Sequence, residues 1–198
     1  MSLLNKNNLE VCKFASKSDT RPALSGVFIT DKLVVATDSF RLVEMTLPTD
    51  VKAEDYPKVE GKTAMRRFKP FIISARELSK IKIQVNKSLP ILNHIAINHI
   101  DDTRVELMTT NSEMLADVKS FRLIDEQFPD YLRLFPIGDP KVEIEVNAEL
   151  LAEVLEVMGK LDSTKKVKIK IYSNQQPIVV EAGNSNQTGR AMVMALRQ

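Results

Sequence analysis

The sequence predicts an α+β fold that repeats one unit three times, each unit consisting of a leading strand, a helix and three further strands. Two observations support this prediction. Short runs in which apolar and polar residues alternate recur between turn residues, which is typical of half-buried strands. Two other segments space their apolar residues at helical intervals and a third follows a good N-cap residue, and strand-like runs follow each of the three. The copies share no visible sequence identity, so the repeat rests on the order of the elements.

The first copy is expected to begin with an amphipathic helix at 9–18, and it lacks an obvious leading strand. The apolar stripe of this helix consists of Val11, Cys12, Phe14 and Ala15. Pro22 ends the helical segment, because the residue before a proline is pushed out of the helical conformation. Strands are then expected at 24–30, 32–36 and 41–47.

The second copy is expected to open with a strand at 71–73. Ser74 suits the N-cap of a helix from Ala75 to about Lys82, since its hydroxyl can accept a hydrogen bond from a free N–H of the first turn. Three strands are expected to follow, at 95–100, 104–109 and 114–123. The turns between them are predicted at Asp101-Asp102 and Asn111-Ser112.

The third copy begins at Lys141 with a run in which Val142, Ile144 and Val146 alternate with Glu143 and Glu145, as in a half-buried strand. Asn147 is expected to cap a helix that ends near Gly159. Its apolar face comprises Leu150, Leu151, Val154, Leu155 and Met158. The last strands are expected at 167–172, 178–181 and 191–196.

The composition restricts the functions open to this chain. Of its 198 residues, 27% are charged and 6% aromatic, which fits a globular protein with a well-solvated surface. The net charge is +2, so nucleic-acid contact requires local clusters of basic residues. The single cysteine, Cys12, excludes an intrachain disulfide and a zinc site made of cysteine pairs. No segment resembles a signal peptide or a membrane span, so we expect a cytoplasmic protein without membrane contact.

Catalytic motifs are absent from the sequence, which contains no glycine-rich phosphate loop, no serine nucleophile elbow and no metal-spaced Cys/His cluster. His94 and His99 lie in apolar strand-like sequence, where a structural role is more common than catalysis. Asp101-Asp102 fits a solvated turn better than a pair of catalytic carboxylates, since no neighbour in sequence would raise either pKa. We therefore expect a protein that is not an enzyme and binds no cofactor or metal.

Three segments carry a family resemblance. The first is Leu24-Ser25-Gly26-Val27 followed by Ala36-Thr37-Asp38-Ser39-Phe40-Arg41-Leu42, and the second is Phe128-Pro129-Asp130-Tyr131. Both resemble the middle domain of the bacterial DNA polymerase III beta sliding clamp, where the first run ends in Ala-Thr-Asp-Gly-His-Arg-Leu. The third segment, 145–198, is similar to the last half of the family's C-terminal domain. In this order and at this spacing, the combination is more specific than any motif alone.

The resemblance implies the DNA-clamp fold, in which the helices of β-α-β-β-β units line a ring and their sheets lie outside. It implies a complete clamp domain at 1–136, like the family's middle domain, and a half domain at 137–198. A whole N-terminal domain and half of the C-terminal one would then be missing, with Gly138-Asp139-Pro140 bridging the parts that remain. So short a clamp suggests a phage or another mobile replicon as its source.

In beta clamps, a hydrophobic pocket near the boundary of the middle and last domains receives a short peptide from polymerases and clamp loaders. The resemblance places the pocket residues of the first domain at Leu24, Thr37, Phe40, Arg41, Leu42, Pro129, Arg133 and Leu134. Those of the last domain fall at Asn147, Leu150, Pro177, Met192, Met194, Leu196 and Arg197. Leu and Met can repack around varied apolar anchors, and Arg can hold carbonyl or acidic groups. Phe40 replaces the family's His and Ala195 its Pro, so the accepted peptide consensus is expected to differ.

The resemblance also implies that Lys and Arg on ring-lining helices contact DNA phosphates, which carry no sequence information. The candidates on the first two helices are Lys6, Lys13, Lys17, Arg21, Arg76 and Lys80. The most basic stretch, 61–70, adds Lys62, Arg66, Arg67 and Lys69. The third helix carries Glu149, Glu153 and Glu156, which leaves Lys160, Lys165 and Lys166 as candidates there. Ordinary solvated surface charges are the alternative interpretation.

Rings of this family contain twelve such units, so three units per chain predict a homotetramer, in which two unpaired half-domains join into one composite domain. The implied function is a replication processivity factor that encircles double-stranded DNA and tethers the polymerase. One alternative is a regulatory decoy, which binds clamp-interacting peptides without encircling DNA. Another is a small hydrolase on an α+β scaffold, for which only His94, His99 and scattered acids are available.

Overall fold

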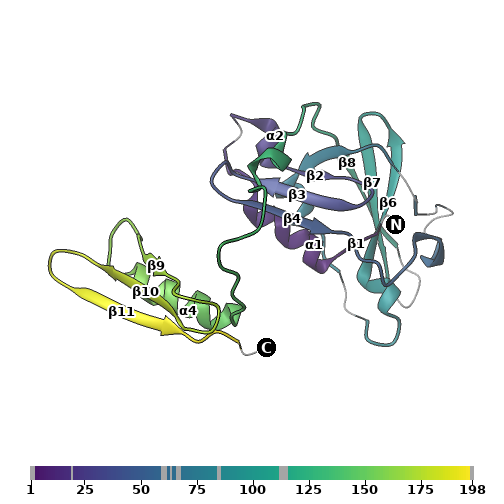
Figure 1. Cartoon of the computed structure of the whole chain (residues 1–198). Coiled ribbons are helices and arrows are strands. Elements are labelled where there is room, and N and C mark those ends of the chain that lie inside the picture. The colour runs from purple at the N-terminus through teal and green to yellow at the C-terminus, as the bar shows by residue number, and fades with distance from the viewer. Residues whose placement is uncertain are drawn as a thin grey trace. The chain divides into compact units, whose positions relative to one another are not determined.

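The computed structural model describes residues 3–18, 20–58, 62, 64–65, 68–83, 86–111 and 116–196. They form two compact bodies, Met1–Tyr131 and Leu132–Gln198, which we call the N-terminal body and the C-terminal body (Figure 1). This division lies close to the break expected after residue 136. The correspondence of the two bodies to a complete and a half clamp domain stays a prediction.

The first repeat of the N-terminal body starts earlier than expected. A short strand, β1 (Leu3–Asn5), leads into α1 (Lys6–Glu10), and a 3-10 turn, η1 (Val11–Phe14), continues that helix. The helix therefore occupies 6–14 and not 9–18, because Asn5 and Asn8 form a capping box in which each side chain accepts a hydrogen bond from the other's backbone N–H, at 3.1 and 3.0 Å. A helical turn, α2 (Pro22–Ser25), replaces the start of the expected strand, and the repeat continues with β2 (Gly26–Ile29), β3 (Leu33–Thr37) and β4 (Leu42–Thr46).

The second repeat follows the predicted order. After a 3-10 turn, η2 (Ala53–Asp55), come β5 (Phe71–Ser74), α3 (Ala75–Leu78), η3 (Pro90–Asn93), β6 (His94–Asp101), β7 (Arg104–Thr110) and β8 (Ala116–Arg122). The helix α3 ends at Leu78 and not at Lys82, and Ser74, the last residue of β5, makes no side-chain capping bond although it stands at the N-cap position. The predicted start of the last strand, Met114, and its turn residue Ser112 lie outside the described residues.

The two repeats exchange their leading strands. One sheet has the order β4-β3-β2-β5 and the other β1-β6-β7-β8, so each sheet is completed by the first strand of the other repeat (Figure 1). Both pairings are antiparallel: Val27 lies opposite Ile73 between β2 and β5, and Leu4 lies opposite Ile95 between β1 and β6. Neither sheet could therefore be complete within one repeat.

One hydrophobic core joins the two repeats. It holds inward-facing residues of both sheets, such as Val27 and Ile95, together with Val11 of η1 and Leu78 of α3, all almost fully buried. Burial of such aliphatic side chains contributes about 1.5–3 kcal/mol each, before the entropy cost of ordering the chain is counted. The helical segments of the two repeats are thus fixed against the same pair of sheets.

The C-terminal body contains the third repeat. A helix, α4 (Ala148–Gly159), precedes a three-stranded sheet of order β11-β10-β9, formed by β9 (Lys168–Lys170), β10 (Ile178–Gly183) and β11 (Thr188–Val193). The predicted N-cap is confirmed, since the Asn147 side chain accepts hydrogen bonds from the N–H groups of Glu149 and Leu150, at 2.9 and 3.2 Å. A smaller core of Met158, Ile178 and Val180 lies between helix and sheet.

The leading strand expected at 142–146 is not a regular strand. Its one ladder contact is an isolated bridge between Val146 and Ala195. The alternation of Val and Glu suits a strand, but a strand is assigned only where a neighbouring strand completes a ladder. The last strand, β11, correspondingly ends at Val193 and not at Leu196.

Candidate functional site

A basic cleft lies over the helical segments of the N-terminal body. Its volume is about 830 Å³, and its lining includes four of the predicted DNA-contacting residues, Lys13, Lys17, Arg76 and Lys80. The first two come from η1 and the segment after it, and the other two from α3 and the turn that follows. Residues from two repeats thus converge on one concave surface.

The cleft has one basic residue that the sequence prediction missed. Arg122, the last residue of β8, lines it beside Leu123 and Ile124. The one acid among its lining residues is Glu77. Nothing in the local sequence of β8 distinguishes Arg122 from other strand residues, because its position in the cleft depends on sheet topology.

The positive charge continues into a neighbouring hollow of about 430 Å³. Lys6, Lys13 and Lys82 line this hollow together with Glu10. The Lys13 ammonium forms an ion pair with the Glu10 carboxylate, and this lysine lowers the pKa of Glu10, first through a hydrogen bond and then through its charge. Lys13 is therefore partly neutralised, whereas no ion pair is found for Lys17, Arg76 or Lys80 within the described residues.

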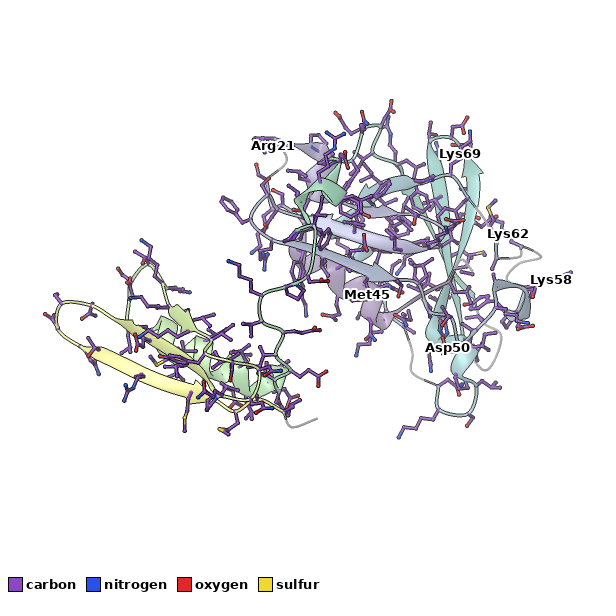
Figure 2. The ribbon with its side chains drawn as sticks, viewed as in Figure 1. Arg21, Met45, Asp50, Lys58, Lys62 and Lys69 are labelled. Carbon is purple, nitrogen blue, oxygen red and sulfur yellow. The ribbon has the colours of Figure 1, made fainter. Side chains whose placement is uncertain are left out.

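The other predicted DNA contacts of the N-terminal body lie elsewhere. Arg21 lies on the opposite side of this body from Lys62 and Lys69 (Figure 2). Lys62 donates hydrogen bonds of 2.8 and 2.7 Å to the Glu106 carboxylate, which lowers the pKa of Glu106 and offsets the lysine's charge. Lys69 is exposed and lies 4.0 Å from Asp102. Arg66 and Arg67 lie outside the described residues.

The basic residues of the third repeat surround the end of α4. Lys160 donates a hydrogen bond of 2.8 Å to Glu156 one turn earlier, while Lys165 and Lys166 are exposed. Glu149, Glu153 and Glu156 are exposed along the helix. The surface of α4 is therefore more acidic than that of the helices in the N-terminal body.

The N-terminal part of the predicted peptide pocket centres on the loop between β3 and β4. Phe40 at its tip is 95% exposed, whereas Leu24 and Thr37 are buried and Leu42 is half-buried. The Thr37 hydroxyl donates to the Arg41 carbonyl at 2.8 Å. Transfer of an exposed phenylalanine ring from water to an apolar partner is favourable, so the exposed Phe40 side chain offers an apolar contact to a ligand.

Asp38 holds this loop in shape. Its carboxylate accepts hydrogen bonds from the N–H groups of Phe40 and Arg41 at 3.0 and 2.9 Å and from the Arg41 guanidinium at 3.0 Å. The two backbone donors are the main cause of a pKa of Asp38 below its ordinary value. Arg41 also donates to the Lys13 carbonyl, at 2.9 Å, and its guanidinium lies over the Phe14 ring, 4.9 Å from the centroid. Ser39 accommodates the turn with a φ of 76°.

The remaining pocket residues predicted for the first domain, Pro129, Arg133 and Leu134, come after β8 in the chain. Pro129 lies in sequence between Phe128 and Tyr131, which pack against Val35 and Ile72 in a cluster separate from the core that the two repeats share. Arg133 and Leu134 lie in η4 (Tyr131–Leu134) and are exposed; both fall in the C-terminal body. Exposed apolar residues continue through Phe135 and Ile137.

The C-terminal part of the predicted pocket lies along the last strand. Met192, Met194 and Leu196 are exposed and alternate with inward-facing Val193, so they share one face. A hollow of about 640 Å³ brings Met194 and Leu196 together with Glu143 and Glu145. Leu150 is exposed on α4, Pro177 is half-buried before β10, Asn147 is used as the helix cap, and Arg197 lies outside the described residues.

Three groups with catalytic potential in the described part of the chain, those of His94, Asp101 and Cys12, are hydrogen-bonded locally or buried. His94 is buried, and its Nδ1 lies 3.2 Å from the carbonyl oxygens of both Pro90 and Ile91, which fits the structural role predicted for it. Asp101 accepts hydrogen bonds from the Thr103 hydroxyl and N–H, which lower its pKa. Burial raises the pKa of Cys12 to about 12, so this thiol is not activated. The His99 side chain lies outside the described part of the chain.

Neither a metal-binding group nor a membrane helix is found in the described part of the chain. No cluster of three or more His, Cys, Asp or Glu side chains is arranged to hold a metal ion there. None of the helices in the described ranges has the length and apolarity needed to cross a membrane.

Comparison with known proteins identifies the fold. No protein-family model matches the chain, and no curated protein sequence matches it. Solved structures do match. The DNA polymerase sliding clamp from Bacillus subtilis is 21% identical with a TM-score of 0.70, over 98% of this chain and 48% of that one. The DNA polymerase III beta chain from Streptococcus pneumoniae is 20% identical with a TM-score of 0.68, over 98% of this chain and 49% of that one.

A third match is the beta subunit from the DNA polymerase of Streptococcus pyogenes, which is 17% identical with a TM-score of 0.69 over 98% of this chain and 50% of that one. The chain thus spans about half the length of the clamps it matches. Identity at this level establishes the fold and leaves the activity to be inferred from the sites. The exchanged sheets, the convergent helices and these matches together show that the chain has the fold of the beta sliding clamp.

Proposed function

We propose that this protein is a DNA sliding clamp, a processivity factor that encircles duplex DNA and tethers a polymerase through a peptide-binding pocket. The observation that carries the proposal is the basic cleft of a chain with the sliding-clamp fold. In this cleft, Lys17, Arg76, Lys80 and Arg122 stand on elements that come from two repeats and converge on one surface.

The charge distribution suits contact with phosphates. Lysine and arginine side chains on a rigid concave surface attract the backbone of any duplex, and contacts of this kind supply affinity without reading the base sequence. A clamp needs such contacts, because it has to slide. The net charge of +2 is small, so the cleft is a local feature of the surface and not a consequence of overall charge.

The exposed apolar residues suit capture of a peptide. Phe40 in the N-terminal body and the Met192, Met194 and Leu196 face in the C-terminal body offer flexible apolar contacts, and Arg41 offers hydrogen bonds. Such surfaces accept short linear peptides with apolar anchors. The polymerase and its clamp loader are the partners we propose for them.

The oligomer follows from counting repeats. The chain contributes three, and a ring of twelve, as the resemblance implies, needs four chains. We propose a homotetrameric ring on this basis. The pairing of two half-domains across chains would give it dihedral symmetry.

A topological experiment tests the proposal. The protein is loaded on nicked circular DNA and on the same DNA linearised with a restriction enzyme, and bound protein is measured after gel filtration at moderate salt. Retention on the circle and loss from the linear form are expected. Equal loss from both DNA forms, combined with binding of a polymerase-derived peptide, would instead identify a decoy.

Charge reversal in the cleft tests the DNA contact itself. Arg76→Glu with Lys80→Glu is expected to weaken DNA binding and to reduce the slope of log affinity against log salt by about 1.8, since each lost phosphate contact removes about 0.9. Lys32→Glu is the matched control, because Lys32 is exposed at the β2–β3 turn and does not line the cleft. A control variant that weakens binding as much as the cleft variant would contradict a localised site.

A further inference from the structure

The exchange of leading strands follows one rule in both repeats of the N-terminal body. In each repeat, the residue at the N-cap position of the helix is paired with a residue of the sister repeat. That partner is the first residue of the strand that follows the sister repeat's helix. Asn5, the cap of α1, lies opposite His94, the first residue of β6. Ser74, at the start of α3, lies opposite Gly26, the first residue of β2.

The leading segment of the third repeat occupies the same place as β5. In the second repeat, Ile73 bridges Leu123 just beyond the last strand, and the Ile124 N–H donates to the Ile72 carbonyl at 2.8 Å. The third repeat reproduces both contacts: Val146 bridges Ala195, and the Leu196 N–H donates to the Glu145 carbonyl at 2.8 Å. Ile73 and Val146 each directly precede the cap residue of their helix.

Only one edge of this segment is used. The second edge of β5 pairs with β2 of the sister repeat, but among the described residues nothing pairs with the second edge of 142–146. Conversely, β9 stands at the end of its sheet, in the position where β2 and β6 each receive a strand from the sister repeat. Within the described part of the chain, the third repeat therefore has an extended segment, 142–146, with one unpaired edge, and a sheet whose end strand, β9, also has an unpaired edge.

The exposure of apolar side chains at β9 differs from that at the paired strands β2 and β6. The second and fourth residues of β2, Val27 and Ile29, are 0% exposed, and so are those of β6, Ile95 and Ile97. Counted from the start of β9, the equivalent residues are Ile169 and Ile171, the latter one position beyond the end of the strand; they are 49% and 45% exposed. The same apolar pattern is thus fully covered in the paired repeats and half covered in the third.

From these observations we propose that 142–146 of one chain pairs antiparallel with the free edge of β9 in a second copy of this chain, and reciprocally, so that two C-terminal bodies form one composite domain. The pairing is isologous, with one two-fold axis between the copies. It reproduces between chains the exchange that the N-terminal body makes within one chain. The inference deepens the proposed function, on which it rests for its purpose of closing a ring.

The cap rule fixes the register of this pairing. With Asn147 opposite Lys168, Val146 lies opposite Ile169 and Ile144 opposite Ile171, on the face that β9 shares with buried Val180. Glu145 then lies opposite Lys170 on the other face. Lys170 already donates to Glu181 of β10 at 2.7 Å, so Glu145 would approach from its free side. Apolar residues meet apolar ones and acids meet bases, which is the pattern that stabilises cross-strand pairs.

A disulfide between the two edges tests the register directly. In a Cys12→Ala background, Glu145→Cys and Lys170→Cys are introduced together, and the oxidised protein is run on a non-reducing gel. Directly opposite residues have Cα atoms about 4.5–5.5 Å apart, within reach of a disulfide. Within one chain the two positions are separated by about three strand spacings, roughly 14 Å, which a disulfide does not span. A covalent dimer is therefore expected.

The matched control places the same substitutions out of register. Glu143→Cys with Lys168→Cys uses the same two strands, but these positions are four residues out of register in the proposed pairing and should not cross-link. No dimer from the first variant, or equal dimer from both, would overturn the proposal. Neither experiment uses DNA, so a dimer combined with failure in the topological experiment rejects the clamp function and leaves this inference standing.

A substitution on the free edge tests the contact in the native protein. Ile171→Lys is expected to weaken self-association about tenfold or more by native mass spectrometry, because it places a charge in the new core. Leu89→Lys is the control, since Leu89 is as exposed as Ile171 but lies in the N-terminal body. If Ile171→Lys leaves the rings unchanged, the proposed strand pairing is wrong, while the proposal of a ring still stands. A wild-type protein that is monomeric at micromolar concentration would also overturn the proposed pairing.

Discussion

The two bodies of this chain contain the same kind of repeat, paired with a second repeat in the N-terminal body and single in the C-terminal body. In the N-terminal body, two repeats exchange leading strands, and inward positions such as Val27 and Ile95 are completely buried. In the C-terminal body, one repeat stands without a sister in the described residues, and the equivalent Ile169 remains half-exposed. The difference teaches that the stable element of this fold is the exchanged pair, since one repeat leaves an edge and an apolar strip uncovered.

Truncation of equivalent isoleucines should separate the two bodies most clearly. Ile95→Ala is expected to cost about 2–5 kcal/mol of unfolding free energy, because it opens a cavity in a closed core. Ile169→Ala should cost well under half as much when measured by urea unfolding at low protein concentration, where chains are not associated. Equal losses at the two positions would mean that the third repeat is as well covered as the first two.

The hydrogen bond that fastens the end of the N-terminal body should have a smaller effect. The Tyr131 hydroxyl donates a hydrogen bond to the Glu44 carboxylate at 2.6 Å. The pKa of Tyr131 is raised to about 12, mainly by burial and further by this hydrogen bond. Tyr131→Phe is expected to cost about 1 kcal/mol, since Glu44 is exposed and water can replace the donor. Tyr172→Phe is the control in the C-terminal body, because Tyr172 is largely exposed, and it should leave stability unchanged in urea unfolding of the same protein.

The smallest expected effect concerns pH and the loop of Phe40. The pKa of Asp38 is lowered in the folded protein, so its contribution to stability is present above the ordinary carboxyl pKa and is lost as the pH falls through the lowered value. Asp38→Asn should therefore differ from the wild type near neutral pH and converge with it in acid. NMR titration of Asp38 gives the direct check: a midpoint at or above the ordinary value, about 3.9, would contradict the hydrogen bonding described for this loop.

The sequence predicted best what depends on local chemistry. The helix α4 begins at its predicted cap, because Asn147 satisfies the free N–H groups of the first turn without help from distant residues. The strand β1 was missed, since three residues carry too little periodicity and their partner, β6, lies some ninety positions later. The segment 142–146 has the predicted pattern but no ladder, because a strand requires a neighbour that sequence alone cannot supply.

The candidate sites show the same limit. Lys13, Lys17, Arg76 and Lys80 could be named because the family resemblance implies basic ring-lining helices, and the cleft brings the four together. Arg122 joins them only through the topology of β8, and Lys62 is offset by Glu106, which is distant in sequence. Convergence of residues from separate repeats is a property of the fold, which local periodicity does not encode.

Cryo-electron microscopy of the assembled 198-residue protein tests the central claim most directly. We predict a closed ring of four chains, with η1, α3 and α4 on its inner wall, a hole wide enough for a double helix, and composite domains where C-terminal bodies meet. Particles that stay monomeric, or a ring with its sheets facing the hole and the basic cleft facing outward, would contradict the account.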